Sequence, residues 1–127
     1  VEGAQSDLEA HVIARTIASS SLVKTAVHGA DPNWGRIIAA LGRAGSSFNL
    51  NDVKLWIGPY EIFSNGRSLD FDRHLVSNFM KARLKGKYLI DDLISIRLSI
   101  GIGKGSATAW GCDLSDQYVR INADYTT

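Results

Sequence analysis

The stretch "ISIRLSIGIGKGSATAWGC", from Ile94 to Cys112, contains the clearest strand pattern of the chain. Apolar residues occupy every second position from Ile94 to Ile102, which is the period of a strand with one buried face. Residues 103–105 (GKG) follow directly and predict a turn in which glycine supplies a positive φ angle. Residues 106–112 form a second extended run. The stretch therefore predicts an antiparallel hairpin.

A second pair of strands is predicted upstream, in residues 53–63. Residues 53–57 (VKLWI) alternate between apolar and other side chains, Gly58-Pro59 turns the chain, and residues 60–63 (YEIF) form the next strand. Asn65-Gly66 follows as a tight-turn pair. Between the first two predicted helices, the short, apolar and partly β-branched residues 22–27 (LVKTAV) predict one more strand.

Three helices are predicted from their caps and apolar stripes. Ser6 with Glu9 is a capping box that opens a helix of about fifteen residues. Asp31 is a favourable N-cap, and Pro32 fits the first position of a second helix, which ends at the glycines 42 and 45. Asp70 caps a third helix that ends at Gly86. Its expected apolar stripe consists of Phe71, Leu75, Phe79 and Met80.

The predicted order is helix, strand, helix, two strands, helix and two strands, with a short helix or turn from Ser115. Adjacent strands are joined by tight turns, so the order lacks the regular βαβ alternation of a doubly wound sheet. We therefore expect one α/β domain over residues 1–127, with layers of helices on a mixed sheet.

Composition excludes several classes of function. The chain has 127 residues, 45% of them hydrophobic, and a net charge of +1 without a basic or acidic block. Binding to nucleic acid or to an anionic membrane is therefore disfavoured. No apolar run reaches the length of a membrane span. The chain begins with valine, so we expect a processed piece, a subunit released by cleavage or a cloned fragment.

The loop from Gly29 to Gly35 lies directly before a predicted helix, where anions can bind. It contains no lysine, and Asp31 would repel a phosphate, so a cap with a packed Trp34 is the favoured interpretation. The run from Gly101 to Gly105 resembles a phosphate loop but lies between two predicted strands. A nucleotide-binding module that uses either loop remains a third, disfavoured hypothesis.

No metal or nucleophile pattern emerges from the remaining candidates. His11, His28 and His74 share no metal-ligand spacing, and we expect His28 at the end of a strand. The single cysteine, Cys112, has no disulfide partner and is interpreted as a small buried apolar residue, in a reducing compartment. Asp70 is expected to cap a helix and Asp72 to be an acid of its first turn, and the acids at 91 and 92 are expected to lie at a solvated strand entry.

The last residues, "DLSDQYVRINADYTT", do not have the composition of a disposable tail. We expect four apolar or aromatic side chains to dock it: Tyr118, Val119, Ile121 and Tyr125. The polar side chains of Asn122, Asp124, Thr126 and Thr127 would then be held at fixed places, as a binding site requires.

Two long motifs resemble one family. "SLVKTAVHGADPNWGRIIAALGRAG" and "SATAWGCDLSDQYVRINADYTT" are similar to motifs of the ornithine acetyltransferases, the glutamate N-acetyltransferases of arginine biosynthesis. The resemblance covers essentially the whole chain. It implies a layered helix-sheet-sheet-helix (αββα) fold and a precursor that cleaves itself into an α and a β chain. It also implies an α₂β₂ assembly, with this chain as the C-terminal portion of the β chain.

The resemblance implies an activity and its site. The β chain's N-terminal threonine takes the acetyl group from N-acetylornithine and passes it to glutamate, and some members also use acetyl-CoA as donor. That threonine is not in this chain, so no catalytic residue is assigned here, and no cofactor or metal is expected. Asn122 and the terminal Thr127 match the family's substrate-binding positions. Glu2 does not match the family's substrate-binding glutamate. In the family a strand follows the motif that contains this glutamate, and Val1-Glu2-Gly3 matches the end of that strand.

Partners and compartment follow from the same resemblance. The expected partners are the α chain, the remaining β-chain segment and small amino-acid substrates, with neither nucleic acid nor membrane. The expected location is the cytoplasm in a bacterium, or the mitochondrial matrix or chloroplast in a eukaryote. The alternative function is a non-catalytic relative that acts in binding or regulation. For the segment from Asp31 to Trp34 a structural role is favoured, and shaping the substrate pocket or the α/β contact is the alternative.

Overall fold

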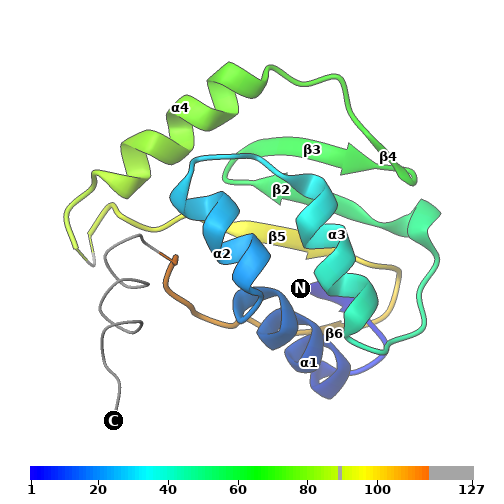
Figure 1. Cartoon of the computed structure of the whole chain (residues 1–127). Helices are drawn as coiled ribbons and strands as arrows, with labels where there is room; N and C mark the ends of the chain where they lie inside the picture. Colours follow the sequence, from blue (N-terminus) through cyan, green and yellow to red (C-terminus); the bar gives the residue numbers. More distant parts are fainter. Residues whose placement is uncertain (89, 115–127) are drawn as a thin grey trace, which may run out of the picture.

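Helices cover one face of a mixed β-sheet in the computed structural model, which describes residues 1–88 and 90–114 (Figure 1). In chain order the elements are β1 (Glu2–Ala4), α1 (Asp7–Ala18), α2 (Ser21–His28), α3 (Trp34–Arg43), the 3-10 helix η1 (Leu50–Asp52), β2 (Lys54–Ile57), β3 (Tyr60–Ser64), β4 (Arg67–Ser68), α4 (Arg73–Leu84), β5 (Ile96–Ser99) and β6 (Gly105–Ser106). The predicted α/β class with a mixed sheet is confirmed.

The sheet has six strands in the order β4-β3-β2-β5-β1-β6. Its first strand lies between the last two: β1 runs parallel to β5, with Glu2 beside Ser99, and antiparallel to β6, with Glu2 beside Ser106. The other neighbouring strands are antiparallel. A parallel pair inside an otherwise antiparallel sheet is what makes the sheet mixed.

The core lies between the helices and one face of the sheet. Leu55, Ile57 and Leu98 point from the sheet into this core, where they meet fully buried residues of α1 and α3 such as Ile13 and Leu41. The alternate positions of the central strands face the other side of the sheet, which no described element covers. The described residues therefore supply one helix layer and one sheet layer of the expected four-layer arrangement.

The predicted first helix is confirmed, with twelve residues. The Ser6 hydroxyl accepts a hydrogen bond from the Glu9 amide at 3.1 Å, as the capping box predicts. The buried side of α1 consists of Ala10, Ile13, Ala14 and Ile17, spaced three and four residues apart. None of the helices within the described ranges is long and apolar enough to cross a membrane.

The strand predicted at residues 22–27 is wrong, because this segment is the helix α2. The Ser20 hydroxyl caps it by accepting from the Val23 amide at 3.4 Å, and the Thr25 hydroxyl donates to the Ser21 carbonyl. Val23 and Ala26 are buried, whereas Leu22 is exposed, which is a helical and not an alternating pattern. His28 therefore ends a helix and not a strand.

The predicted hairpin of residues 94–112 is also wrong. β5 is limited to Ile96–Ser99, β6 to Gly105–Ser106, and β1 separates them in the sheet. A Cβ atom on Gly103 or Gly105 would collide with the backbone of Ala4 or Ser6. These glycines therefore permit close approach of two backbone segments, and neither has the positive φ angle of the predicted turn.

Both remaining helix starts lie later than predicted. Asn33 caps α3 in place of Asp31, and Asp72 caps α4 in place of Asp70. The inward side of α4 is formed by Val76 and Met80, whereas Leu75 is exposed. The predicted β2–β3 pair and its following turn are confirmed, and Asn65 and Gly66 have φ angles of 53° and 79°.

Candidate functional site

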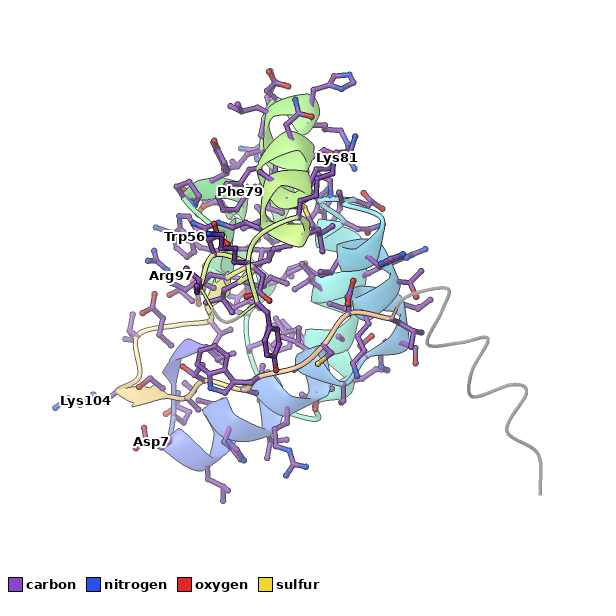
Figure 2. All side chains as sticks on the ribbon, turned by 90° about the vertical axis from the view of Figure 1, so that its left-hand side faces the viewer. Asp7, Trp56, Phe79, Lys81, Arg97 and Lys104 are labelled. Carbon is purple, nitrogen blue, oxygen red and sulfur yellow. The ribbon has the colours of Figure 1, made fainter. Side chains whose placement is uncertain are left out.

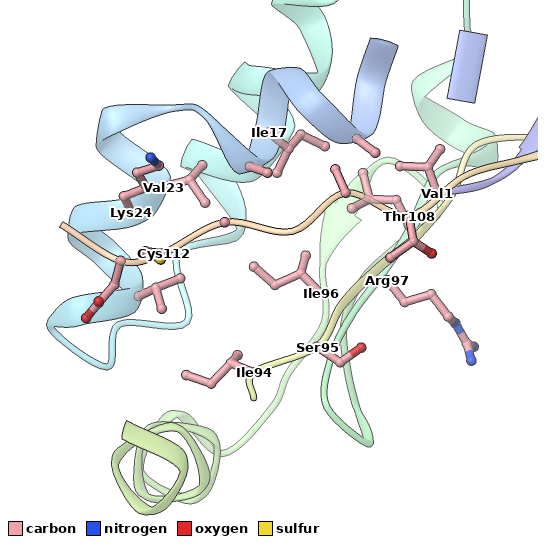
Figure 3. A pocket seen from close by; sticks show the side chains of 17 residues that line it. Val1, Ile17, Val23, Lys24, Ile94, Ser95, Ile96, Arg97, Thr108 and Cys112 are labelled. Atoms are coloured by element: carbon pink, nitrogen blue, oxygen red, sulfur yellow. The ribbon is translucent and has the colours of Figure 1, made fainter. Parts of the chain in front are cut away.

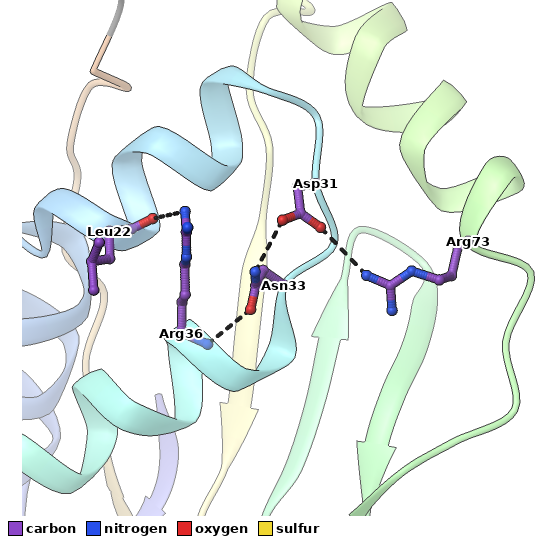
Figure 4. Close-up of polar contacts among 5 residues, drawn as sticks. All are labelled: Leu22, Asp31, Asn33, Arg36 and Arg73. Atoms are coloured by element: carbon purple, nitrogen blue, oxygen red, sulfur yellow. Dashed lines mark hydrogen bonds and ion pairs between the residues drawn. The ribbon is translucent and has the colours of Figure 1, made fainter.

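The loop between α2 and α3 is a network of polar contacts centred on one side chain (Figure 4). The Asn33 side-chain oxygen accepts from the Arg36 amide at 3.0 Å, which caps α3. The Asn33 side-chain nitrogen donates to the Asp31 carboxylate at 2.9 Å. One amide side chain therefore fixes both the start of the helix and the acid that precedes it.

Two arginines connect this loop to neighbouring helices. Arg73 at the start of α4 lies 3.4 Å from the other oxygen of the Asp31 carboxylate. Arg36 of α3 donates to the Leu22 carbonyl of α2 at 3.1 Å. The ring of Trp34 packs on the ring of Phe63 in β3, with centroids 5.3 Å apart. The loop thus joins three helices to each other and to the sheet.

These contacts decide against an anion site at this loop. Asn33 already engages one amide of the first turn of α3, and the Asp31 carboxylate contributes negative charge at the same helix end. A phosphate bound there would find the Arg36 amide already engaged, and the Asp31 carboxylate would repel it. The geometry favours the structural interpretation, while a role in shaping a substrate pocket stays a prediction.

A cavity of about 360 Å³ lies between the helices and the sheet, beside β5 (Figure 3). Its helical wall is formed by α1 and α2, with Ile17 and Val23, and its opposite wall by residues 94–98, 108–109 and 111–113. Lys24, Ser95, Arg97, Thr108 and Asp113 supply polar groups. A concave site that combines apolar walls with polar groups is the default candidate for a binding site. No sequence pattern indicated this cavity, because its walls come from segments that lie far apart along the chain.

One polar pair lies at the cavity's rim. The His28 Nδ1 atom is 3.0 Å from an Asp113 carboxylate oxygen, and both side chains are partly exposed.

Burial lowers the pKa of the Val1 amino group below its ordinary value of 8.0. That group also donates to the Ala107 carbonyl at 2.9 Å.

The sequence-predicted candidates do not assemble into one centre. Asn122 and Thr127 lie outside the described residues, as do Ser115 and the four apolar residues expected to anchor the tail. His11 and His74 are exposed, and no cluster of metal-ligating side chains occurs in residues 1–88 and 90–114. Cys112 is exposed, so its prediction as a buried apolar residue is wrong.

The uncovered face of the sheet carries a charged and aromatic cluster that sequence reasoning missed. The Arg97 guanidinium lies over the Trp56 ring, 4.1 Å from its centroid, and the two residues are neighbours on β5 and β2 (Figure 2). Arg97 also lies 3.5 Å from the Glu2 carboxylate. The alternation along each strand could have indicated that these side chains share a face.

Comparison with known proteins gives consistent matches over the whole chain. The profile described as the ArgJ family matches residues 1–127. An "Arginine biosynthesis bifunctional protein ArgJ" of Prochlorococcus marinus (strain NATL2A) is 90% identical over 100% of this chain and 30% of that protein. A protein of the same name from strain MIT 9313 is 60% identical with the same coverage. The chain thus spans about a third of the length of these curated relatives.

A solved structure agrees with the fold. The crystal structure of the arginine biosynthesis bifunctional protein argJ from Bacillus halodurans matches with a TM-score of 0.87 and 39% identity, over 98% of this chain and 55% of that chain.

Proposed function

The chain belongs to the ArgJ family, and on that premise we propose that it forms the C-terminal part of the β chain of a glutamate N-acetyltransferase. The enzyme would move an acetyl group from N-acetylornithine to glutamate. The family match over residues 1–127 carries the proposal, and the relatives' printed role in arginine biosynthesis supports it. Acetyl-CoA is the proposed second acetyl donor, as the resemblance implies for some members of the family.

The proposed reaction uses a threonine that this chain does not contain. At the N-terminus of the β chain, the threonine's own amine accepts the proton of its hydroxyl, whose oxygen attacks the acetyl carbonyl. Ornithine leaves with a proton, and an acetyl ester remains on the threonine. The amine of glutamate then attacks this ester, which forms N-acetylglutamate and restores the hydroxyl.

Asn122 and Thr127 are the proposed substrate-binding residues of this chain. An amide and a hydroxyl can both donate and accept hydrogen bonds, so they can hold the polar groups of an amino-acid substrate without charge. No cofactor is required, because the acetyl group passes only through the threonine ester.

The uncovered sheet face supports the proposed assembly with an α chain in an α₂β₂ complex. Trp56 is only half-buried there, with the Arg97 guanidinium over its ring, and no described helix covers this face of the sheet. We expect this face to be covered by other segments of the enzyme, and the isolated chain to aggregate or bind hydrophobic dyes. The relatives come from bacteria, so the bacterial cytoplasm is the proposed compartment.

Expression of the complete reading frame that contains this chain tests the proposal. We expect the purified protein to appear as two cleaved chains and to form N-acetylglutamate from N-acetylornithine and glutamate. The isolated 127 residues, and the complete protein with its nucleophilic threonine changed to alanine, serve as controls and should be inactive. An uncleaved or inactive complete protein would favour the non-catalytic alternative, and activity of the isolated chain would refute the assignment of the nucleophile.

A further inference from the structure

Residues 108–114 leave the sheet after β6 and run along the helices to α2 (Figure 3). A Cβ atom on Gly111 would lie only 3.0 Å from the carbonyl oxygen of Ala18, so the backbone passes close to the end of α1. Further on, the Leu114 amide donates to the Lys24 carbonyl of α2 at 3.4 Å. The segment therefore ends, within the described residues, against α2.

One side chain of α2 holds this segment. The His28 Nδ1 atom lies 3.0 Å from a carboxylate oxygen of Asp113. An ionised carboxylate can only accept hydrogen bonds, so Nδ1 carries the proton and donates it. His28 is the last residue of α2, where carbonyl groups without helical partners disfavour a carboxylate. The donor of His28 offsets this repulsion, so the contact fixes the place of Asp113 at the end of the helix.

This contact precedes the residues that carry the proposed substrate-binding side chains. Asn122 and Thr127 follow Asp113 in the last part of the chain. A binding side chain contributes more when its backbone is already held, because less conformational entropy is then lost as the substrate binds. Fixing Asp113 on α2 restricts the positions that the residues after it can reach.

We propose that His28 is a positioning residue of the acetyl-transfer site, which fixes the start of the residues that carry Asn122 and Thr127 through its hydrogen bond to Asp113. The effect on the substrate rests on the proposed function, whereas the hydrogen bond itself does not. The side chains of His28 and Asp113 are 41% and 32% exposed, and exposed pairs are weak, so we expect changes of about two- to fivefold.

Kinetics of the complete protein that contains this chain test the proposal. In His28→Ala we expect KM for N-acetylornithine and glutamate to rise about two- to fivefold with an unchanged kcat, because Asn122 and Thr127 would hold the substrate in the ground and transition states alike. The melting temperature should stay within about 2 °C of wild type. A contact with a merely structural role would instead lower the melting temperature and the amount of active enzyme, and would leave KM unchanged.

Three further variants test whether the hydrogen bond is the cause. His28→Asn keeps a side-chain N–H near the position of Nδ1 and should restore KM to that of wild type. Asp113→Ala should raise KM as much as His28→Ala, and the double variant should raise it no further, because both changes remove the same contact. His11→Ala, which changes an exposed histidine of α1, is the matched control and should keep the wild-type KM.

Hydrogen exchange in the complete protein separates this inference from the proposed function. The Leu114 amide should exchange about two- to fivefold faster in His28→Ala than in wild type, and at the wild-type rate in His28→Asn. An inactive wild-type protein would refute the proposed reaction, and the exchange at Leu114 would then show by itself whether His28 holds the segment. An unchanged KM in His28→Ala, no rescue by His28→Asn, independent effects in the double variant or unchanged exchange at Leu114 would each overturn the proposal.

Discussion

Replacing Asn33 by alanine separates the structural role of the loop before α3 from a role in a substrate pocket. The change removes the oxygen that accepts from the Arg36 amide and the nitrogen that donates to the Asp31 carboxylate. It leaves the packing of the neighbouring Trp34 ring on Phe63 in place. The helix start loses its cap, and the carboxylate loses a half-buried partner.

The two lost contacts set the expected magnitude. Loss of an N-cap side chain costs about 1 kcal/mol, and loss of the second hydrogen bond costs about 0.5–1.5 kcal/mol. The exposed Arg73–Asp31 ion pair contributes little, with side chains 57% and 40% exposed. The sum is about 1.5–2.5 kcal/mol, which for a domain of this size lowers the melting temperature by about 5–12 °C.

Thermal unfolding of three variants measures these contributions separately. Asn33→Ser keeps a cap oxygen and loses only the amide donor, so it should lose about half as much stability as Asn33→Ala. Arg73→Ala should change the melting temperature by about 2 °C or less. In the complete protein, kcat/KM of Asn33→Ser should stay within about threefold of wild type. A wild-type melting temperature together with a large loss of kcat/KM for Asn33→Ala would refute the structural interpretation.

Three further predictions follow from the same reasoning. In the complete enzyme, Asn122→Ala should lower kcat/KM by roughly 5- to 150-fold, and removal of Thr127 should act similarly without changing the melting temperature; wild-type kinetics of both variants would contradict their assignment. Gly58→Ala should destabilise the chain by about 1–3 kcal/mol in a denaturant titration, because φ is +54° there and the new Cβ would collide with an aromatic ring of α4. Gly42→Ala is its control, with nothing within 4 Å of the new Cβ, and should stabilise α3 by up to about 1 kcal/mol. The lowered pKa of the Val1 amine means that the unfolded chain binds more protons, so stability should rise with pH between that pKa and 8.0, and an N-acetylated chain should lack this rise in calorimetry.

Local signals predicted the elements whose geometry is decided within a few residues. The capping box of Ser6 and Glu9 starts α1 where expected, and Asn65-Gly66 turns the chain after β3 with two positive φ angles. The cap of α3 was misplaced because Asp31 and Asn33 are both good cap residues. Only the amide side chain of Asn33 can accept a hydrogen bond from the Arg36 amide and, at the same time, donate one to the Asp31 carboxylate.

Long-range pairing explains the larger errors. A three-residue strand such as β1 has no periodicity, yet it enters the sheet between β5 and β6 and separates the predicted hairpin. We expected Gly103 and Gly105 to turn this hairpin. Glycine is needed at both positions because the backbones of Ala4 and Ser6 pass too close to leave room for a Cβ atom. The walls of the cavity come from segments that lie far apart along the chain, so the cavity could not be predicted from sequence alone.

The loop before α3 and the cavity beside β5 are connected through α2. Arg36 holds the Leu22 carbonyl, and Arg43, at the other end of α3, donates to the Ser20 hydroxyl at 3.1 Å. Val23, Lys24 and Val27 of the same helix line the cavity. A motif that looks like a ligand loop therefore fixes the helix that forms one wall of the cavity.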